Sequence, residues 1–346
     1  MDHQQRSLRF GAAVITCALL LRLGTTGFFE PVAEFLTKPN IASFLIYLET
    51  GRIVRFSQSS EILEVFAYES AEPSFALRPE AAAEPSQMLP PVFRAGDGQS
   101  VKFKNSAGKK FDAGELITRP LQWELRSEEP TVLVLHTHAT ESYTKAKGET
   151  YKESAAFRTL NENYNMVSVG DHLTQLLEEG GIKVLHDRSL HDYPSYNGSY
   201  NNSRKAVKNY CKDYPSVCLV LDLHRDASSD LNNQMRTKAT VDGKQSAQIM
   251  FVVGTNGTGL RHPNWKENLA LALKLQVQME RSAPGICRNI NLRSQRFNQD
   301  LSPGALIVEV GAAGNSREEA LTAIEVLAKA ILELAGGTET EEEHDS

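Results

Sequence analysis

Cysteine is scarce in this chain, with four in 346 residues, and no two of them form a C-x-x-C pair. So few cysteines exclude a disulfide-dense scaffold, and without paired thiols a cysteine-ligated zinc site is not expected. Cys211 and Cys218 are close enough in sequence to form a bridge, but their spacing does not establish one. Isolated buried thiols are the favoured interpretation.

A basic surface for nucleic acid is also missing. The formal net charge is −6, and five acidic residues lie in the last eight positions, so removing them leaves −1 for the rest of the chain. No arginine-rich or aromatic platform is present, so nucleic-acid binding is excluded. The chain also lacks G-x-S-x-G and G-x-x-x-x-G-K-[ST] motifs, which argues against serine hydrolases and P-loop enzymes.

An apolar run of 20 residues at 10–29 contains one charge, Arg22. This length is close to that needed to cross a bilayer, and Arg22 costs roughly 3 kcal/mol, a cost that snorkelling reduces. Arg6 and Arg9 precede the run, so we expect residues 1–35 to form a cytoplasmic stub and a single transmembrane anchor. A cleaved signal peptide is the alternative, although no clear A-x-A site follows. Either way, the bulk of the chain is expected outside the cytoplasm, at the cell membrane.

Residues 36–125 are expected to connect this anchor to a folded domain. The stretch 41–48 is too short to span a bilayer and suits an amphipathic or juxtamembrane helix. Five of the 14 prolines lie between positions 73 and 91, among Ala, Glu and Ser, which is typical of a semi-extended linker. At the other end, the acidic residues 337–346 are expected to form a solvated, disordered tail.

The region from 126 to 336 alternates short apolar runs with longer helical patterns. Runs continuous in Val, Ile and Leu indicate strands buried on both faces. The expected strands lie at 131–135, 182–186, 217–223, 249–253 and 305–310, and the expected helices near 161–179, 199–212, 264–281 and 316–335. This order predicts an α/β fold with three αβα layers and a mostly parallel or mixed central sheet.

Residues of the kinds that bind metals follow three of these strands. The strand 131–135 leads into HTHATE, the strand 217–223 leads into His224, and Glu309 lies near the end of the last strand. In open α/β sheets, ligands gather at the carboxyl ends of the strands. We therefore expect these side chains at one edge of the sheet.

The spacing His138-x-x-Glu141 predicts a metal chelate. If the segment turns into a helix, positions i and i+3 share a face and both reach one ion. His224 would be the third ligand, and two histidines with a carboxylate form a catalytic zinc set that leaves a fourth position for water. His136 is the alternative to His138. The two alternate along an extended backbone and point to opposite sides, so one of them is expected to be structural.

Glu309 is the expected proton shuttle. An acid in the apolar strand ALIVEV is costly unless it has a partner or a task, and the chemistry needs a carboxylate that is not itself a metal ligand. Arg225 is the expected donor to an oxyanion. The alternative interpretation is that Glu309 only pairs with Arg225.

The loop HDRSLHDYPSYNGSY at 186–200 holds two histidines and two aspartates, which allows a second metal site. Its tyrosines, proline and glycine favour instead a shaped loop over the cleft.

Five sequence blocks carry a family resemblance: VLVLHTHATESY, VSVGDHL, HDRSLHDYPSYNGSYNNSR, DLHRDAS and FNQDLSPGALIVEVGAAGNS, in this order between about residues 130 and 335. They resemble stage II sporulation protein P of endospore-forming Firmicutes. The resemblance implies a zinc-dependent peptidoglycan hydrolase related to the N-acetylmuramoyl-L-alanine amidases, which cleave the amide between the muramic lactyl group and L-alanine. It also implies an endopeptidase activity on peptide cross-links. The implied setting is the sporulation septum and engulfment, with a lytic transglycosylase (stage II sporulation protein D) and a membrane protein (stage II sporulation protein M) as partners.

Carried over by motif, the resemblance implies zinc ligands at His138 (or His136), Glu141 and His224. It implies the catalytic glutamate at Glu309. The sequence GAAGN departs slightly from the family pattern, because a threonine is expected after the first glycine. This departure bears only on fine substrate contacts.

Two other functions share part of this pattern. A zinc carboxypeptidase also combines H-x-x-E with a distant histidine and a glutamate base, but it needs a positive group for the terminal carboxylate. A wall-binding or scaffolding protein without catalysis has no need of a complete metal set.

Overall fold

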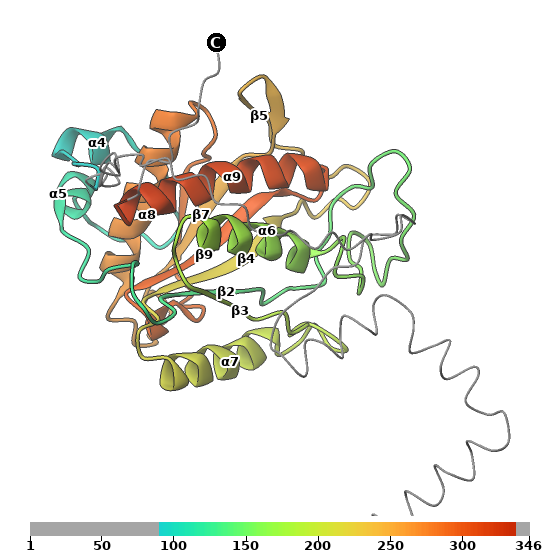
Figure 1. The fold of residues 1–346 in the computed structure, drawn as a ribbon, viewed down its shortest axis with the longest axis horizontal. Coiled ribbons are helices and arrows are strands. Elements are labelled where there is room, and N and C mark those ends of the chain that lie inside the picture. The colour runs from blue at the N-terminus through green and yellow to red at the C-terminus, as the bar shows by residue number, and fades with distance from the viewer. Residues whose placement is uncertain (1–89, 337–346) are drawn as a thin grey trace, which may run out of the picture. The chain divides into compact units, whose positions relative to one another are not determined.

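The computed structural model describes residues 90–336 (Figure 1). The predicted anchor, the juxtamembrane stretch, most of the proline-rich linker and the acidic tail lie outside the described residues. Of the helices between positions 90 and 336, none combines the length and the apolar character that a membrane span requires.

The centre of the domain is a seven-stranded sheet in the order β1-β8-β7-β9-β4-β2-β3. The strands are β1 Phe103–Asn105, β2 Val132–Leu135, β3 Val184–His186, β4 Leu219–Asp226, β7 Ile249–Gly254, β8 Ile290–Arg293 and β9 Gly304–Ala312. Every neighbouring pair is parallel except β7 and β9, which are antiparallel. The sheet is therefore mixed, which is one of the two arrangements, mostly parallel or mixed, that the sequence predicts. A separate hairpin joins β5 Ala239–Val241 to β6 Lys244–Ser246.

Helices cover both faces of the sheet. They are α4 Ala95–Ser100, α5 Ala113–Thr118, α6 Met166–Glu179, α7 Ser199–Asp213, α8 Trp265–Ser282 and α9 Arg317–Leu334, with a short 3-10 turn, η1 Gln299–Leu301. Figure 1 shows α6 and α9 on one side of the strands and α7 on the other. The predicted three-layer α/β architecture is confirmed.

Alternation along β4 shows which residues face which layer. Leu219 and Leu221 belong to the larger apolar cluster, which also contains residues of α6, α8 and α9. Val220 belongs to a smaller cluster with Val207 of α7. Successive strand residues point to opposite faces, so the even-numbered positions of β4 face α7. This assignment fixes the direction of the polar residues at the end of the strand.

Helix ends are marked by polar caps. Ser316 begins α9 with a capping box: its hydroxyl accepts a hydrogen bond from Glu319 N, and Glu319 accepts one from Ser316 N. At α6, the side-chain oxygen of Asn165 accepts a hydrogen bond from Val167 N at 3.0 Å. Caps of this kind contribute about 1 kcal/mol each and hold the start of the helix in place.

The folded domain begins earlier than the predicted boundary at 126. The segment 95–118, which the sequence analysis assigns to the linker, forms α4, β1 and α5. Phe103 of β1 pairs with Ile290 of β8 and packs edge to face against the ring of Phe111. These elements are short and mostly polar, so they lack the hydrophobic periodicity from which helices and strands are predicted. The sequence therefore predicts a linker where the structure has α4, β1 and α5.

Three of the four cysteines lie in the described residues. Cys211, Cys218 and Cys287 are all free thiols. The bridge between Cys211 and Cys218, which the spacing left open, is not formed.

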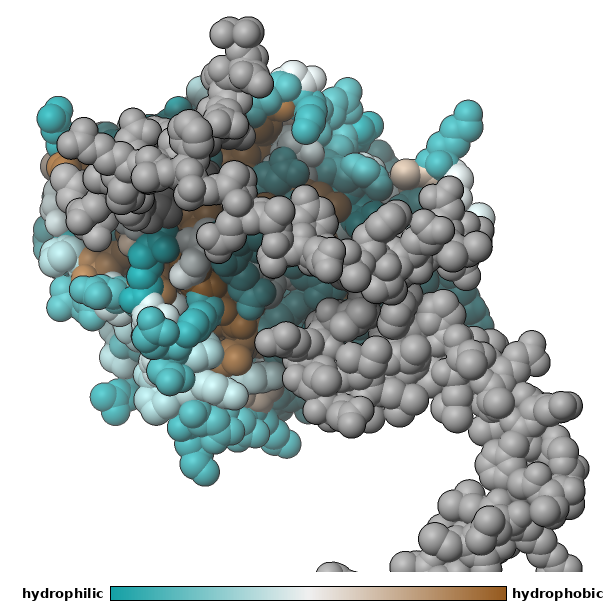
Figure 2. Space-filling model, viewed as in Figure 1, coloured by the Kyte–Doolittle hydropathy of each residue, from teal (hydrophilic) through white to brown (hydrophobic). Residues whose placement is uncertain are grey.

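On the face shown in Figure 2, the coloured surface is mainly hydrophilic, with apolar side chains visible between polar ones. In the described part of the chain, seven large hydrophobic side chains are exposed: Val92, Leu160, Tyr193, Tyr196, Tyr214, Leu231 and Leu260. Tyr193 and Tyr196 lie close together in one loop.

Candidate functional site

The three strand ends that carry predicted site residues lie side by side. β2, β4 and β9 are neighbours in the sheet and run parallel, so their carboxyl ends share one edge. His224 of β4 is the register partner of Glu309 of β9. By the alternation described above, both residues face the α7 side of the sheet, together with Asp222.

His138 reaches the same side from the segment after β2. This segment is a turn closed by a 3.1 Å hydrogen bond from Glu141 N to His138 O, not the helix that the spacing suggests. The rings of His138 and His224 are 5.2 Å apart and perpendicular. Burial lowers the pKa of His138 to about 4, and its Nδ1 has no hydrogen-bond partner among the described residues. The ring is therefore neutral near pH 7, with a lone pair available to a ligand.

Glu141 lies next to His224. Its Oε2 is 3.6 Å from His224 Nδ1 and accepts a hydrogen bond from Arg225 N at 3.2 Å. Its Oε1 accepts a hydrogen bond from Arg158 Nη2 at 3.2 Å. Burial raises the pKa of Glu141, but Arg225 and His224 outweigh that effect and lower the pKa below its usual range. Glu141 is therefore a carboxylate although its side chain is buried.

His224 lies between two carboxylates. Besides the contact with Glu141, its Nε2 is 3.0 Å from Asp222 Oδ1, a charge contact whose angle does not make a hydrogen bond. Burial lowers the pKa of His224, but these two carboxylates raise it well above its ordinary value. Asp222 also accepts hydrogen bonds from Thr137 N at 2.7 Å and Thr137 Oγ1 at 2.6 Å. Asp222 thus ties the end of β4 to the turn that carries His138.

Glu309 has the opposite electrostatic character. No cation pairs with it among the described residues, and its Oε2 is buried without a hydrogen-bond partner. Burial raises the pKa of Glu309 to about 8. The alternative interpretation, an ion pair with Arg225, is not what the structure shows. An isolated buried carboxyl beside metal-type ligands is the arrangement expected of a group that exchanges protons.

The side chains of His138, Glu141 and His224 fit a zinc ion chemically. Within residues 90–336, no three or more His, Cys, Asp or Glu side chains are already grouped so as to hold a metal ion. The donor types nevertheless match zinc, and two ligands on a tetrahedral zinc lie about 3.4 Å apart. The 3.6 Å between His224 Nδ1 and Glu141 Oε2 is close to that separation. The buried, unpartnered Nδ1 of His138 supplies a third donor.

His136 belongs to a different network. Its Nε2 lies 2.9 Å from His186 Nε2, and its Nδ1 lies 3.3 Å from the carbonyl oxygen of Leu223. His186 Nδ1 in turn lies 3.1 Å from Asp171 Oδ1. Both ring nitrogens of His136 are therefore engaged, and of the two histidines it is His138 that the structure brings to the site.

Arg225 is tied to neighbouring groups. Its Nε and Nη2 donate to the backbone carbonyls of Ser142 and Phe157, at 3.1 and 3.0 Å. Its Nη1 lies 3.6 Å from Glu141 Oε1. The guanidinium therefore braces the turn after β2 and the carboxylate of Glu141, and its role as an oxyanion donor stays a prediction.

The loop at 186–200 covers the site, as the favoured interpretation states. Its Asp187 pairs with His191, with 2.9 Å between Oδ2 and Nε2. Tyr196 stacks on His138 with ring centroids 4.4 Å apart. Tyr200, at the start of α7, lies at right angles to the same ring at 5.6 Å.

Several residues of the site were not singled out from the sequence. Asp222 could have been found, because it lies two residues before His224 on the same strand and so on the same face. Arg158, Tyr196 and Tyr200 lie in segments whose path depends on long-range contacts, so no local pattern marked them.

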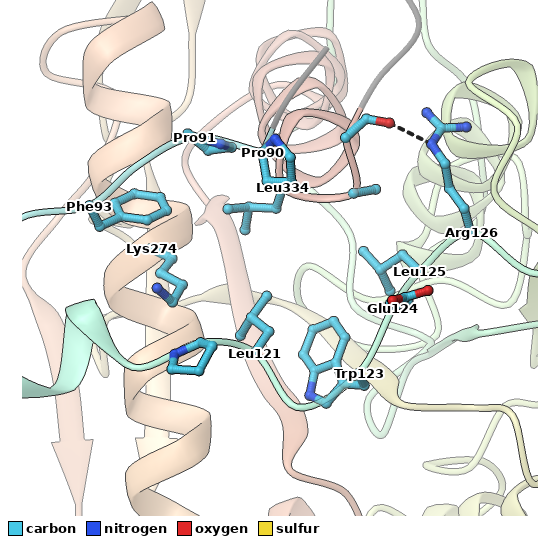
Figure 3. Close-up of a pocket in the computed structure, with 13 residues that line it drawn as sticks. Pro90, Pro91, Phe93, Leu121, Trp123, Glu124, Leu125, Arg126, Lys274 and Leu334 are labelled. Atoms are coloured by element: carbon cyan, nitrogen blue, oxygen red, sulfur yellow. Dashed lines mark hydrogen bonds between the residues drawn. The ribbon is translucent and has the colours of Figure 1, made fainter. Parts of the chain in front are cut away.

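Another cavity lies elsewhere in the domain. It measures about 600 Å³ and is lined by Pro90, Pro91, Phe93, Pro120, Leu121, residues 123–126, Lys274 of α8 and the end of α9 (Figure 3). Trp123 in its wall adjoins Gly304, the first residue of β9. The cavity is therefore at the amino ends of the strands that carry the site, and it holds no histidine.

A family model described as stage II sporulation protein P matches residues 55–332 of the chain. The chain belongs to the stage II sporulation protein P family. Stage II sporulation protein P of Bacillus subtilis (strain 168) is 31% identical over 221 residues, which are 60% of this chain and 51% of that protein. The chain thus spans about half the length of this curated relative.

Solved structures of similar shape include two N-acetylmuramoyl-L-alanine amidases. AmiC2 of Nostoc punctiforme is 14% identical, with a TM-score of 0.35 over 58% of this chain and 95% of that one. An amidase from Clostridium difficile 630 is 15% identical, with a TM-score of 0.35 over 60% of this chain and 94% of that one.

Proposed function

We propose that this member of the stage II sporulation protein P family is a zinc-dependent peptidoglycan hydrolase that cleaves the amide between N-acetylmuramic acid and L-alanine. The observation that carries the proposal is the meeting of His138, Glu141 and His224 beside an unpaired, buried Glu309. Family membership supports the sporulation setting and the wall as substrate.

The metal ligands and the proton carrier have separate roles. His138, Glu141 and His224 would hold the zinc, which when bound lowers the pKa of a water and polarises the scissile carbonyl. Glu309 Oε2 accepts the proton of the attacking water and then donates it to the departing amine of L-alanine. A pKa of about 8 leaves both forms of Glu309 accessible near neutral pH, which is what a group that both accepts and donates requires.

The surrounding groups hold this arrangement in place. Asp222 orients His224, and the backbone N–H of Arg225 together with Arg158 orients Glu141. Preorganised ligands of this kind lose less entropy on metal binding. Tyr200 is a second candidate donor to the developing oxyanion besides Arg225, since its ring lies beside both histidines.

The proposal includes the cellular setting that the sequence suggests. The anchor at 10–29 would hold the catalytic domain outside the cytoplasm at the sporulation septum, and the stage II sporulation proteins D and M would be its partners. These parts of the proposal rest on the sequence and on the family, because residues 1–89 lie outside the part of the chain that the structure describes.

A carboxypeptidase would need a cation free to bind a terminal carboxylate. The two arginines beside the site are both engaged: Arg158 pairs with Asp192 and Glu141, and Arg225 binds backbone carbonyls. The structure therefore favours the amidase.

Digestion of purified sacculi by the full chain, followed by mass spectrometry of the released fragments, tests the proposal. Intact stem peptides should appear when zinc is present and disappear after treatment with a chelator. Loss of a single terminal residue would identify a carboxypeptidase, and cleaved cross-links would identify the endopeptidase activity. Unchanged sacculi with zinc present would identify a binding protein and overturn the proposal.

A further inference from the structure

Arg158 contacts both the proposed metal site and the loop that covers it. Its Nη2 donates to Oε1 of Glu141 at 3.2 Å, and its Nη1 donates to Oδ2 of Asp192 at 2.6 Å. Glu141 is one of the proposed metal ligands, whereas Asp192 belongs to the 186–200 loop. One guanidinium thus holds both carboxylates, and its planar fork of donors fixes how they lie relative to each other.

Both ion pairs are shielded from water. The side chain of Asp192 is fully buried, that of Glu141 is 6% exposed and that of Arg158 is 19% exposed. Opposite charges attract more strongly where water is excluded, and a buried carboxylate that loses its partner is costly. The two contacts therefore resist separation, and a shift of one carboxylate is passed to the other through the guanidinium.

The same loop also reaches a second proposed ligand. Tyr196 stacks on His138, with ring centroids 4.4 Å apart and ring planes 10° from parallel. The guanidinium of Arg158 lies over the Tyr196 ring, 4.9 Å from its centroid, which is a cation–π distance. The loop is therefore connected to His138 through Tyr196 and to Glu141 through Arg158, and these two connections also contact each other.

The backbone just before Arg158 has an uncommon conformation. Phe157 has a φ of +53°, in the left-handed region that residues other than glycine seldom adopt. Its carbonyl oxygen accepts hydrogen bonds from Ser142 N at 2.9 Å and from Arg225 Nη2 at 3.0 Å. Strained conformations of this kind persist only where the surrounding contacts hold them, and they concentrate at functional sites. Here the strained residue precedes the arginine that joins the metal site to the loop.

We propose that Arg158 is a positioning residue that couples metal binding at Glu141 and His138 to the position of the 186–200 loop. Arg158 holds Oε1 of Glu141, which leaves the second oxygen, Oε2, to the metal. When Glu141 and His138 are fixed by a bound metal, Arg158 and Tyr196 are fixed with them, and so is the loop. Coupling between two sites is reciprocal, so a loop held in place strengthens metal binding in turn. This inference rests on the metal site of the proposed function and adds a means of regulating it.

Hydrogen–deuterium exchange of the full chain, measured by mass spectrometry with zinc and with chelator, tests the coupling. In the wild type, zinc should slow the exchange of backbone amides in residues 192–200 by about fivefold or more. Arg158→Lys keeps the positive charge but loses the planar fork, so it changes the geometry and not the charge of the site. In this variant zinc should still slow exchange in residues 136–142 but leave residues 192–200 unchanged. Its zinc affinity, measured by competition with a chromogenic chelator, should fall about tenfold.

Arg204→Lys is the matched control. The side chain of Arg204 is 21% exposed, close to the value for Arg158, and it also pairs with an aspartate, Asp300, through two contacts of 2.7 Å. Neither Arg204 nor Asp300 belongs to the proposed metal ligands or to the 186–200 loop. This variant should therefore keep the wild-type zinc affinity and the zinc-dependent protection of the loop.

Equal exchange of residues 192–200 with and without bound zinc in the wild type would overturn the coupling, as would full zinc-dependent protection in Arg158→Lys. If Arg158→Lys does not fold, Asp192→Asn breaks the same connection from the loop side and should lose the protection; retained protection there also overturns the coupling. No zinc binding by the wild type would overturn the metal site and the coupling together. Zinc-dependent protection of the loop without digestion of sacculi would leave the coupling intact and overturn the proposed amidase. Zinc-dependent digestion without protection of the loop would do the reverse.

Discussion

Glu309 of β9 lies directly across from His224 of β4, as its register partner on the adjacent parallel strand. Neighbouring strands are about 4.8 Å apart, and both side chains face α7. The separation between a proposed metal ligand and the proposed proton carrier is thus set by the backbone hydrogen bonds of the sheet, and not by a loop. The sheet should therefore keep the distance between these two positions when the side chain of Glu309 is replaced.

Glu309→Gln should abolish amide cleavage while zinc binding is retained. The amide keeps the size and the position of the carboxyl but cannot accept a proton, so the turnover rate should fall about 100-fold or more. Release of stem peptides from sacculi and the zinc content of the purified protein measure the two effects. A variant with normal turnover would contradict the role of Glu309, and a variant without zinc would make Glu309 a ligand.

Asp222→Asn should weaken zinc binding about 10- to 100-fold, because Asp222 lies beside His224 Nε2 and orients the ring. Competition with a chromogenic chelator measures the affinity. Asp300→Asn is a matched control, since Asp300 is another partly buried aspartate that pairs with Arg204 instead. Equal zinc affinity in the Asp222→Asn variant and the wild type would show that the contact does not position His224.

Gly170→Ala should destabilise the domain although alanine favours helix. A methyl group at this position in α6 would lie 2.5 Å from both His136 Nε2 and His186 Nε2, so this histidine pair would have to move. Overpacking of this kind costs about 1–3 kcal/mol, which chemical denaturation can measure. Gly96→Ala in α4 is the control, since a methyl group there meets nothing within 4 Å. It should leave stability equal or raise it by up to about 1 kcal/mol. Equal stability of Gly170→Ala and the wild type would mean that the histidine pair is loosely packed.

His262 should make the domain acid-sensitive. It is 3% exposed, neither ring nitrogen has a hydrogen-bond partner among the described residues, and burial lowers its pKa from 6.5 to about 4. The unfolded chain therefore binds a proton first as the pH falls, so stability is lost between about pH 6.5 and pH 4. The loss amounts to at most about 3 kcal/mol.

The His262→Leu variant should lose less stability than the wild type between about pH 6.5 and pH 4. Denaturant unfolding of the wild type and the variant at several pH values, both with chelator present, isolates the difference, because the other histidines contribute equally to both. Parallel profiles over pH 4–6.5 would show that His262 does not titrate in this range.

The main elements of the fold could be predicted because they are long and apolar. The strands at β2, β4, β7 and β9 and the helices α6–α9 lie within a few residues of their expected positions. β1 and β8 were missed, because their sequences FKN and INLR mix polar with apolar residues and so lack the continuous apolar run that marks β2. The antiparallel pairing of β7 with β9 depends on long-range contacts, so no local sequence pattern predicts it.

The edge of the sheet that carries the site could also be predicted, since three strands end in polar residues there. The bracing contacts of Arg225 could not be predicted, because its hydrogen bonds to the carbonyls of Ser142 and Phe157 depend on the path of the turn after β2. The stacking of Tyr196 on His138 could not, because it depends on the path of a loop that Arg158 and Thr140 hold from another part of the chain.

The chain enters the described domain at Pro90 and leaves it at Gly336, and both residues line the cavity at the amino ends of β4 and β9. The catalytic edge is at the far end of these strands, which span about 25 Å at 3.3 Å per residue. Pro90 and Gly336, the two ends of the described domain, therefore lie at the opposite edge of the sheet from the proposed metal ligands. A substrate that meets the ligand edge meets the described domain on the side away from both of its ends.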